Sequence, residues 1–387
     1  MSRTEAIWAE IDLSAIRHNF RQVADTVAPK TKVMAVVKAD AYGHGAVPVA
    51  KAVITEGAAF LGVARLCEAI ALRDADIETP ILILGYTPPS QAQVLGSNNI
   101  TQAVYSLEYA HLLEEEAAKA GCTVQAHLKV DSGMGRIGLL PPENNGPQNF
   151  PDILQELRQL KHLHFDGLFT HFASSDSQNL TNARRQLDIF KKALRHCEDA
   201  GFSFSWVHAS NSAAVMTLPD ARFDMVRLGI SLYGLYPSNE VDKSVLDLRP
   251  AMSIKARLAH IKRVPAGVPV SYGHTYTTNA ETTIGTVPVG YADGYDRLLS
   301  NPNAIDGKGG MMLVGGKRVP VVGRVCMDQT MIDLSAVPNA AIEDEVVLLG
   351  RQGDEEYSAD EWAERLKTIN YEVVSRLMPR VKRIYVG

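Results

Sequence analysis

The sequence predicts an α/β protein with an N-terminal (β/α)8 barrel of the TIM type, followed by a mostly β C-terminal domain. Up to about residue 240, short apolar runs alternate with helical patterns, as in a parallel sheet whose strands are connected by helices. After Pro250 the apolar residues alternate with polar ones at a period of two, and glycine-rich turns separate the segments. A chain of 387 residues is long enough for two such domains. We therefore expect a barrel domain over residues 1–240 and a β domain over residues 241–387.

The barrel is predicted from eight apolar runs that have the length of buried strands. Helical patterns lie between most of these runs, most clearly at Leu107–Ala120 and Ala183–Ala200. Eight strands alternating with helices over roughly 230 residues match a (β/α)8 barrel, which typically takes ~250 residues. An open, doubly wound sheet is the alternative, because strands are difficult to count from one sequence. The predicted strands lie near residues 33–37, 59–64, 80–84, 102–105, 124–130, 165–171, 204–208 and 225–232.

The C-terminal part has the pattern of short strands with one exposed face. Residues Met252–Val264 and Ile284–Val289 alternate apolar and polar side chains, and a helix is expected near Ala359–Thr368. The stretch Pro237–Pro250 is the predicted linker between the domains. Trp8–Asp12 also has a strand pattern, and the sequence leaves open which of the two domains it joins.

Composition and charge argue against several classes of protein. The formal net charge of −5 at pH 7 gives no support for binding to nucleic acid or to a membrane. The N-terminal residues lack the apolar core of a signal peptide, so we expect a cytoplasmic protein. The four cysteines lack the paired spacing of a zinc site, and no metal is expected. We expect Cys67, Cys122 and Cys197 to be free, buried thiols.

A lysine follows the first predicted barrel strand. Val33–Val37 is a continuous apolar run, Lys38 comes directly after it, and Gly43 and Gly45 indicate a tight loop. The loops at the carboxyl ends of barrel strands carry the chemistry of such folds. An amine that is partly desolvated there becomes a nucleophile toward carbonyl groups. A solvated lysine at the end of a strand is the alternative interpretation of this segment taken alone.

Eight segments, in order along both domains, resemble the alanine racemases, which are pyridoxal-phosphate enzymes. Each segment is weak evidence alone, but the full set covers essentially the whole chain and makes the resemblance specific. The segments are Ala35–Gly45, Lys129–Arg136, Thr170–Phe172, His208–Ala213, Val226–Ile230, Ser271–Gly273, Gly290–Gly294 and Gly323–Gln329.

The resemblance implies that pyridoxal 5'-phosphate is the cofactor and that Lys38 forms its aldimine. The segment at Asn211 and Ser212 has the pattern of a helix start, where free N–H groups and the helix dipole favour a phosphate. In the family, backbone N–H groups and two tyrosine hydroxyls complete the phosphate site. The matching residues here are Gly229, Ile230, Tyr42 and Tyr371.

Arg227 matches the arginine that faces the pyridine nitrogen of the cofactor in the family. A guanidinium with a pKa above ~12 does not pass its proton to that nitrogen, so the ring remains a weak electron sink. A short-lived carbanion then favours reprotonation over transamination. The resemblance implies that His208 holds Arg227 and that His171 packs on the cofactor.

Racemisation removes a proton from one face of the α-carbon and delivers one to the other face, so two bases are expected. In the family, the residue matching Lys38 acts on the D-isomer and the residue matching Tyr272 acts on the L-isomer. A head-to-tail homodimer brings them together there. Each site borrows Tyr272 and the turn of Cys326, Met327 and Asp328 from the partner subunit.

Further residues match substrate-binding and supporting positions of the family. Arg136 is implied to bind the phenolic oxygen of the cofactor and the substrate carboxylate, assisted by the backbone of Met327. Lys129 matches a lysine that is carbamylated in many members, and an unmodified lysine would repel Arg136. The positions that line the substrate access path match Asp176, Tyr291, Arg297 and Arg324.

The resemblance therefore implies an enzyme that interconverts L-alanine and D-alanine by a two-base mechanism and supplies D-alanine for bacterial peptidoglycan. A racemase of broader specificity and a pyridoxal-phosphate decarboxylase are the alternatives. A decarboxylase would lack the surroundings of Tyr272 and the Cys326–Asp328 turn in this form. A non-catalytic pyridoxal-phosphate binding protein would have no need of the second domain.

Overall fold

The computed structural model describes residues 5–301 and 309–387, and its contacts divide the chain into two compact units. The barrel unit comprises Ala15–Ala41 and Ala46–Arg249. The β unit comprises Met1–Ser14, Tyr42–Gly45 and Pro250–Gly387.

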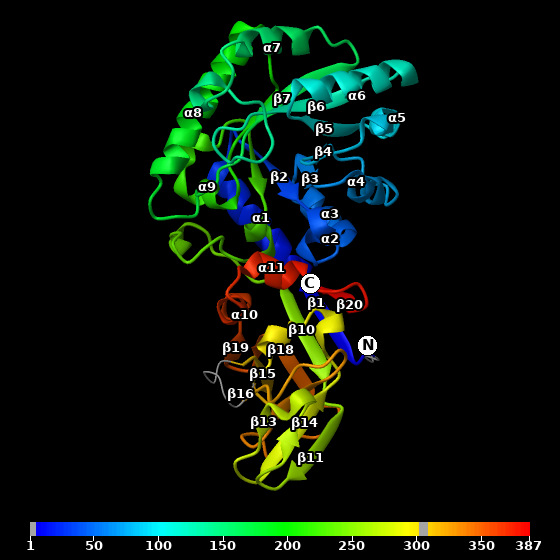
Figure 1. The fold of residues 1–387 in the computed structure, drawn as a ribbon, viewed down its shortest axis with the longest axis vertical. Coiled ribbons are helices and arrows are strands. Elements are labelled where there is room, and N and C mark those ends of the chain that lie inside the picture. The colour runs from blue at the N-terminus through cyan, green and yellow to red at the C-terminus, as the bar shows by residue number, and fades with distance from the viewer. Residues whose placement is uncertain (1–4, 302–308) are drawn as a thin grey trace. The chain divides into compact units, whose positions relative to one another are not determined.

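The barrel unit contains an eight-stranded parallel sheet in the order β8-β7-β6-β5-β4-β3-β2-β9 (Figure 1). Each predicted strand overlaps one of these eight strands, because strands covered on both faces have continuous apolar runs. The strands are β2 (Lys32–Val36), β3 (Phe60–Val63), β4 (Ile81–Ile83), β5 (Ile100–Val104), β6 (Val124–Lys129), β7 (Leu163–Phe169), β8 (Trp206–His208) and β9 (Met225–Leu228).

The two end strands of this sheet, β8 and β9, lie next to each other. The N–H of Asp224 donates to the carbonyl of Val207 at 3.0 Å, and the N–H of Arg227 donates to the carbonyl of Ser210 at 2.9 Å. The sheet is therefore a nearly closed barrel, and the predicted (β/α)8 fold is confirmed over the open, doubly wound alternative.

Helices connect the strands and lie outside the sheet (Figure 1). The predicted helix at Leu107–Ala120 is α6, which begins where the Ser106 side chain accepts from the N–H of Tyr109 at 3.1 Å. It ends at Gly121, whose φ of 62° is left-handed and favours glycine. The segment α2 (Lys38–Tyr42) has a left-handed backbone at Ala39, Asp40 and Ala41. The other helices between α1 and α9 are α1 (Leu13–Val27), α3 (Ala46–Thr55), α4 (Leu66–Arg73), α5 (Ala92–Ser97), α6 (Leu107–Ala120), α7 (Phe150–Arg158), α8 (Thr181–Asp199) and α9 (Ser212–Thr217).

The β unit is built on a seven-stranded sheet, with β16-β15-β18-β10-β1-β20 in order and β19 paired to β18. Strand β1 pairs with β10 and β20, so the N-terminal strand belongs to this unit. The strands are β1 (Ile7–Asp12), β10 (Met252–Arg257), β15 (Met311–Val314), β16 (Lys317–Pro320), β18 (Glu345–Gln352), β19 (Glu355–Tyr357) and β20 (Lys382–Val386).

Among the described residues of the β unit, two smaller sheets and two short α-helices accompany the seven-stranded sheet. One contains β11 (His260–Val264), β14 (Thr282–Val287) and β17 (Thr330–Asp333), and the other contains β12 (Pro269–Val270) and β13 (Tyr276–Thr277). The helices are α10 (Ala359–Leu366), as predicted from the sequence, and α11 (Asn370–Ser375).

The cysteine prediction is partly wrong. All four thiols are free, but only Cys197 is buried; Cys122 is half-buried and Cys67 is exposed. Cys67 follows the first residue of α4, on the solvent-facing side of a short helix, which composition alone does not reveal. Within residues 5–301 and 309–387, no helix has the length and apolar character needed to cross a membrane.

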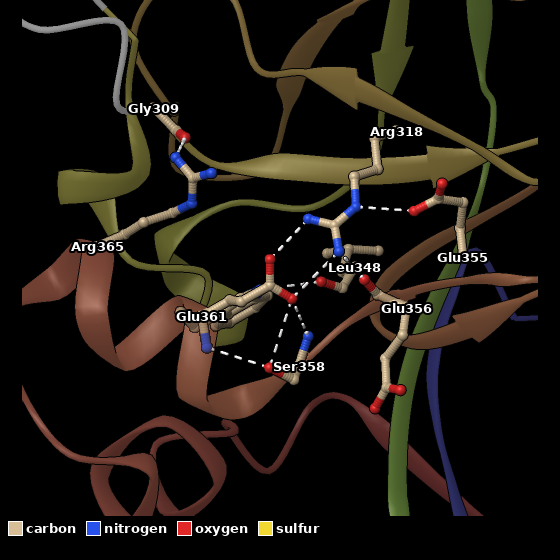
Figure 2. Close-up of polar contacts among 9 residues, drawn as sticks. Gly309, Arg318, Leu348, Glu355, Glu356, Ser358, Glu361 and Arg365 are labelled. Carbon is tan, nitrogen blue, oxygen red and sulfur yellow. Dashed lines mark hydrogen bonds and ion pairs between the residues drawn. The ribbon is translucent and has the colours of Figure 1, made fainter. Parts of the chain in front are cut away.

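A charged cluster fixes α10 to the strands before it (Figure 2). The Glu361 side chain accepts from the N–H of Ser358, and the Ser358 hydroxyl accepts from the N–H of Glu361, which is a capping box. Arg318 donates from Nη1 to Glu361 Oε1 at 2.6 Å and from Nε to Glu355 Oε2 at 2.9 Å, and its Nη2 also donates to the carbonyl of Glu356. Glu361 therefore both caps the start of α10 and connects this helix to Arg318 on β16.

Replacing Glu361 with Ala should lower the free energy of unfolding by about 1–2 kcal/mol, because both the cap and the bond to Arg318 are lost. Solvent screens the ion pair, since the side chains of Arg318 and Glu361 are about one-third exposed, so the cap supplies much of the effect. Urea unfolding followed by fluorescence measures the change. The matched control is Glu364→Ala on the same helix, which is exposed and should have little effect. Equal destabilisation by both variants would contradict the account.

Candidate active site

The carboxyl ends of the barrel strands carry a cluster of cationic and aromatic side chains. Lys38 follows β2, Lys129 ends β6, His171 follows β7, His208 ends β8 and Arg227 lies within β9. The structure thus brings together the barrel residues that the sequence predicts for the cofactor site, as expected for strand ends of one parallel barrel.

The backbone after Lys38 makes a left-handed turn. Ala39, Asp40 and Ala41 have φ between 52° and 53°, a region that costs L-residues about 1–2 kcal/mol each. The N–H of Ala41 donates to the carbonyl of Val37 at 2.9 Å, and Asp40 Oδ1 accepts from the N–H of Ala46 at 2.8 Å. These bonds hold a strained conformation directly beside Lys38, which is a common feature of functional sites.

The Lys38 amine is in a setting that favours its neutral form. Burial is the main cause that lowers the pKa of Lys38, and the charges of Arg136 and Arg227 lower it further. The carboxylate of Glu68 opposes them and raises this pKa. The neutral amine is the nucleophilic form of a lysine side chain.

The Arg227 guanidinium is held by five acceptor contacts. Its Nη2 donates to the carbonyls of Thr170 at 2.7 Å and Ala209 at 2.8 Å and lies 3.2 Å from His171 Nδ1. Its Nη1 donates to His208 Nδ1 at 2.9 Å and to the carbonyl of His208 at 3.2 Å. Among the described residues, no hydrogen bond engages Nε, which stays available as a donor.

The contact between Arg227 and His208 determines which ring nitrogen of His208 carries the proton, and so the direction of the hydrogen bond from His208 to His127. A guanidinium only donates, so His208 Nδ1 accepts and His208 Nε2 carries the proton. His208 Nε2 then donates to His127 Nδ1 at 3.0 Å. The remaining ring nitrogen of His127 lies 3.3 Å from Asp166 Oδ1, without a regular hydrogen bond. Each hydrogen bond in this series is therefore donated in the same direction, from Arg227 to His208 and from His208 to His127.

The histidines beside Arg227 are neutral at neutral pH. Burial lowers the pKa of His208 well below its usual value, and Arg227 and His127 lower it further. Burial and Arg227 likewise lower the pKa of His171. Burial and the charge of Arg136 lower the pKa of Arg227 to about 9, so its guanidinium keeps its charge at pH 7. Arg227 is thus the stable cation of this group.

The loop after β6 presents Arg136. The Asp131 carboxylate accepts from the N–H groups of Gly133, Met134, Gly135 and Arg136 at 2.8–3.1 Å, which fixes the turn before the arginine side chain. Arg136 is exposed and is close enough to Lys38 to lower the pKa of that amine. This places Arg136 at the mouth of the same cluster.

Lys129 is a buried amine surrounded by positive charge. It is 5% exposed, and burial followed by Arg136 and Arg227 lowers the pKa of Lys129 to about 7. Its Nζ lies 5.3 Å from the centroid of the Phe169 ring. The lowered pKa favours the neutral amine, which is the form that adds to carbon dioxide.

We expect Lys129 to form a carbamate whose amount rises as the pH rises through about 7. The modification converts a cation that repels Arg136 into an anion that attracts it. A ¹³C NMR spectrum in ¹³C-bicarbonate measures the carbamate carbon, and Lys129→Gln is the control that removes it. A spectrum without this signal at pH 9 would show that Lys129 stays unmodified.

The start of α9 and the loop after β9 are joined through one hydroxyl. Asn211 caps the helix by accepting from the N–H of Ala214 at 2.9 Å. Ser212 Oγ accepts from the N–H of Gly229 at 2.9 Å, immediately before the buried Ile230. The predicted phosphate donors of these two loops therefore lie at one place in the barrel unit. Asp176, in the loop after β7, is half-buried, and its carbonyl accepts from Ser238.

In the β unit, the structure brings the predicted second base close to the predicted Cys326 turn. The Ser271 hydroxyl, next to Tyr272, donates to the carbonyl of Arg324 at 2.6 Å and lies 3.5 Å from Cys326 Sγ. The N–H of Tyr291 donates to the carbonyl of Cys326 at 3.2 Å. Tyr272 is 69% exposed, which is unusual for so large an aromatic side chain.

Further contacts position the other predicted residues of the β unit. Arg380 bonds to Asp293 and Asp328 at 2.7 Å each and so braces the turn that contains Met327. Met327 is 53% exposed, and Arg297 is also exposed. The rings of Tyr42 and Tyr371 lie 6.2 Å apart, so the two predicted phosphate-binding tyrosines are neighbours within this unit.

Sequence reasoning missed two residues of the barrel cluster. His127 lies two residues before Lys129 on β6, and side chains at that spacing share one face of a strand, so this spacing was an available signal. Glu68 bonds to the backbone after Lys38, and a contact with a backbone N–H leaves no residue pattern that could reveal it.

A (β/α)8 barrel with a lysine and an arginine at its strand ends, joined in sequence to a mostly β unit, defines a two-domain barrel enzyme. Residues 11–237 match the alanine racemase N-terminal domain, and residues 251–385 match the alanine racemase C-terminal domain. The chain belongs to the alanine racemase family, and it is an isomerase of the racemase type.

Individual relatives agree with this assignment. The chain is 49% identical to an alanine racemase of Desulfovibrio desulfuricans over 98% of both chains. A solved alanine racemase of Clostridium difficile has a TM-score of 0.91 and 42% identity, over 99% of this chain and 96% of that one. A histidine racemase of Leuconostoc mesenteroides has a TM-score of 0.87 and 32% identity, over 100% of this chain and 99% of that one.

Proposed function

We propose that the protein interconverts L-alanine and D-alanine with pyridoxal 5'-phosphate as cofactor, using Lys38 and Tyr272 as the two bases. The observation that carries the proposal is the Lys38 amine, whose pKa is lowered at a barrel strand end beside Arg136 and Arg227. An amine in this setting is suited both to carbonyl addition and to proton transfer.

The donor set of the barrel unit fits pyridoxal phosphate. The guanidinium groups of Arg136 and Arg227 supply positive charge near Lys38, which suits an anionic cofactor and a substrate carboxylate. Lys38 would bind the aldehyde carbon, and the N-terminal end of α9 with Gly229 and Ile230 would hold the phosphate, together with Tyr42 and Tyr371. When bound, the cofactor supplies an electron sink that acidifies the α-hydrogen of the amino acid.

Arg227 would govern how strong that electron sink is. Its terminal nitrogens are engaged by backbone carbonyls and neutral histidines, so Nε is the donor left for the pyridine nitrogen. Arg227 holds its proton at neutral pH, because its pKa is still about 9. Arg227 would therefore donate a hydrogen bond to the pyridine nitrogen without protonating it, and its contacts with His208 and His171 would keep the guanidinium oriented.

Residues of the two predicted domains, 1–240 and 241–387, would complete each other's sites in a homodimer. The β unit exposes Tyr272 by 69%, Met327 by 53% and Tyr291 by 42%. A base has to be shielded from water to act selectively, so these side chains would be covered by the barrel of a second copy. A head-to-tail dimer with two-fold symmetry repeats this contact twice.

Alanine is the substrate that the proposal favours. The chain is 49% identical to the alanine racemase of Desulfovibrio desulfuricans and 32% identical to the histidine racemase of Leuconostoc mesenteroides. Arg136 and the backbone of Met327 would bind the substrate carboxylate. Asp176, Tyr291, Arg297 and Arg324 would line the access path. We propose a cytoplasmic role in which the enzyme provides D-alanine for peptidoglycan.

The test is covalent capture of the cofactor. The purified protein, loaded with pyridoxal phosphate, should be yellow, and borohydride should fix the label on Lys38 because the proposal assigns the aldehyde carbon to that amine and not to Lys129. Peptide mapping identifies the labelled lysine, and Lys38→Ala is the control that should retain no label. Recovery of the label on Lys129 or another lysine would overturn the assignment.

A further inference from the structure

Glu68 connects the backbones that follow two neighbouring barrel strands. It is the third residue of α4, and its Oε2 accepts from the N–H groups of Ala64 at 2.7 Å and Arg65 at 3.1 Å, just after β3. Its Oε1 accepts from the N–H of Ala39 at 2.6 Å, just after Lys38 and β2. Strands β2 and β3 are themselves paired. One carboxylate therefore ties the lysine-bearing end of β2 to the end of β3.

Helix capping explains only one half of this arrangement. A glutamate at the third position of a helix reaches back to the N–H of the residue that caps the helix, which here is Arg65. One carboxylate oxygen is sufficient for that contact. The other oxygen bonds to Ala39, which is 29 positions away in sequence and does not belong to the helix. This second bond therefore does not stabilise α4; it connects Glu68 to the backbone after Lys38.

The bond from Glu68 to Ala39 lies at the left-handed turn after Lys38, where the backbone conformation is unfavourable for L-residues. Ala39 begins the left-handed turn, and Ala39, Asp40 and Ala41 occupy that conformation without a glycine. A hydrogen bond from an N–H to a carboxylate is stronger than one between neutral groups. The bond to Ala39 thus holds the first residue of the turn. Lys38 immediately precedes that residue, so the turn sets the direction of its side chain.

The charge of Glu68 also acts on Lys38. The cations that act on this amine in the described barrel unit are Arg136, Arg227 and Lys129. After burial, the two arginines lower the pKa of Lys38, whereas Glu68 raises it. The same carboxylate that holds the backbone is therefore the anion that balances these cations.

We propose that Glu68 is a positioning residue for Lys38, which holds the backbone behind the lysine and balances the positive charge around its amine. The inference rests on the proposed function, since it takes Lys38 as the cofactor-binding lysine and as one of the two bases. Glu68 contacts neither substrate nor reacting atoms in this account. It acts through the backbone of Ala39 and through its charge.

The chain contains a matched control for this side chain. Glu114 on α6 is also half-buried, and its two oxygens accept from the N–H groups of Lys161 and His162 at 2.9–3.1 Å. These residues precede β7, at the amino end of the barrel strands, whereas Lys38 lies at the carboxyl end. Glu114→Gln removes the same kind of bond as Glu68→Gln without acting on Lys38.

The experiment compares full-length wild type, Glu68→Gln, Glu68→Asp and Glu114→Gln. The first readout is steady-state racemisation by the loaded enzyme. The second is the rate at which pyridoxal phosphate reloads the full chain after the cofactor has been removed, measured by absorbance at several pH values. Only the neutral Lys38 amine reacts, so the midpoint of this pH profile reports its protonation.

We expect Glu68→Gln to shift the reloading midpoint downward by about 1 pH unit, because a nearby anion that favoured the charged amine is gone. It should lower kcat about 10- to 100-fold through misplacement of Lys38, with little change in KM. Glu68→Asp should lower kcat similarly, since the shorter side chain does not span both loops. It should keep a midpoint near that of wild type, because the charge remains.

Glu114→Gln should match wild type in both readouts. A wild-type midpoint and wild-type kcat in folded Glu68→Gln would overturn the proposal, and so would equal shifts in Glu68→Gln and Glu114→Gln. Failure of the wild type to bind pyridoxal phosphate or to racemise alanine would instead refute the proposed function. Circular dichroism shows whether each variant is folded.

Discussion

Replacing Tyr272 with Phe should slow the exchange of the α-hydrogen of L-alanine by about 10²- to 10⁴-fold, the usual cost of losing a general base. Exchange from D-alanine should be largely spared, because the proposal assigns Lys38 as the base for that isomer. The substitution removes only the hydroxyl, and Tyr272 is 69% exposed in the single chain, so the β unit should fold normally. Proton NMR in D2O follows each enantiomer separately.

The control for this experiment is Tyr291→Phe, on another exposed tyrosine of the β unit that is assigned to the access path and not to proton transfer. It should leave the ratio of the two exchange rates near that of wild type. If Tyr272→Phe slowed α-hydrogen exchange from L-alanine and from D-alanine equally in a folded protein, the assignment of one base to each isomer would be wrong.

Mixing a Lys38→Ala subunit with a Tyr272→Phe subunit should restore activity to about a quarter of the wild-type sites. Random pairing makes about half of the dimers mixed, and two-fold symmetry gives each mixed dimer one intact composite site. Each variant alone lacks a base at every site, so both homodimers should be nearly inactive. The unsorted mixture from co-expression tests this value; mixed dimers isolated with two affinity tags should have about half of the wild-type sites, because one of their two sites is intact.

The control is a mixed dimer of wild type with a double variant that has both Lys38→Ala and Tyr272→Phe in one chain. That mixed dimer contains one altered residue at each of its two sites and should have no intact site. Restored activity is expected only when the substitutions are on different subunits. Inactive mixed dimers of Lys38→Ala with Tyr272→Phe would place both bases within a single chain.

Most of the barrel could be predicted from the sequence because parallel strands covered on both faces have continuous apolar runs, such as Val33–Val37. The membership of β1 could not be predicted. Trp8 pairs with Lys255 and Lys382, and such long-range strand pairing leaves no local pattern. The exposure of Cys67 was also missed, because residue type indicates average burial only.

In the candidate site, too, some features could be predicted from the sequence and others could not. Lys38, Arg227 and Tyr272 lie in recognisable motifs, so the resemblance identified them. The left-handed turn at Ala39–Ala41 contains no glycine, and a positive φ is therefore not indicated by its residues. The contact from Glu68 to Ala39 uses a backbone N–H, and the helix cap is Arg65 instead of the serine or threonine typical of a capping box. Only the folded backbone reveals these features.

The most direct test of the central claim is incubation of the loaded protein with L-alanine in D2O while optical rotation and α-deuteration are followed together. Rotation should decay to zero and deuterium should enter the α-position of the D-alanine formed, because the proposed mechanism removes the proton on one face and replaces it on the other. Deuteration of L-alanine without loss of rotation would contradict it, and so would release of carbon dioxide with formation of an amine.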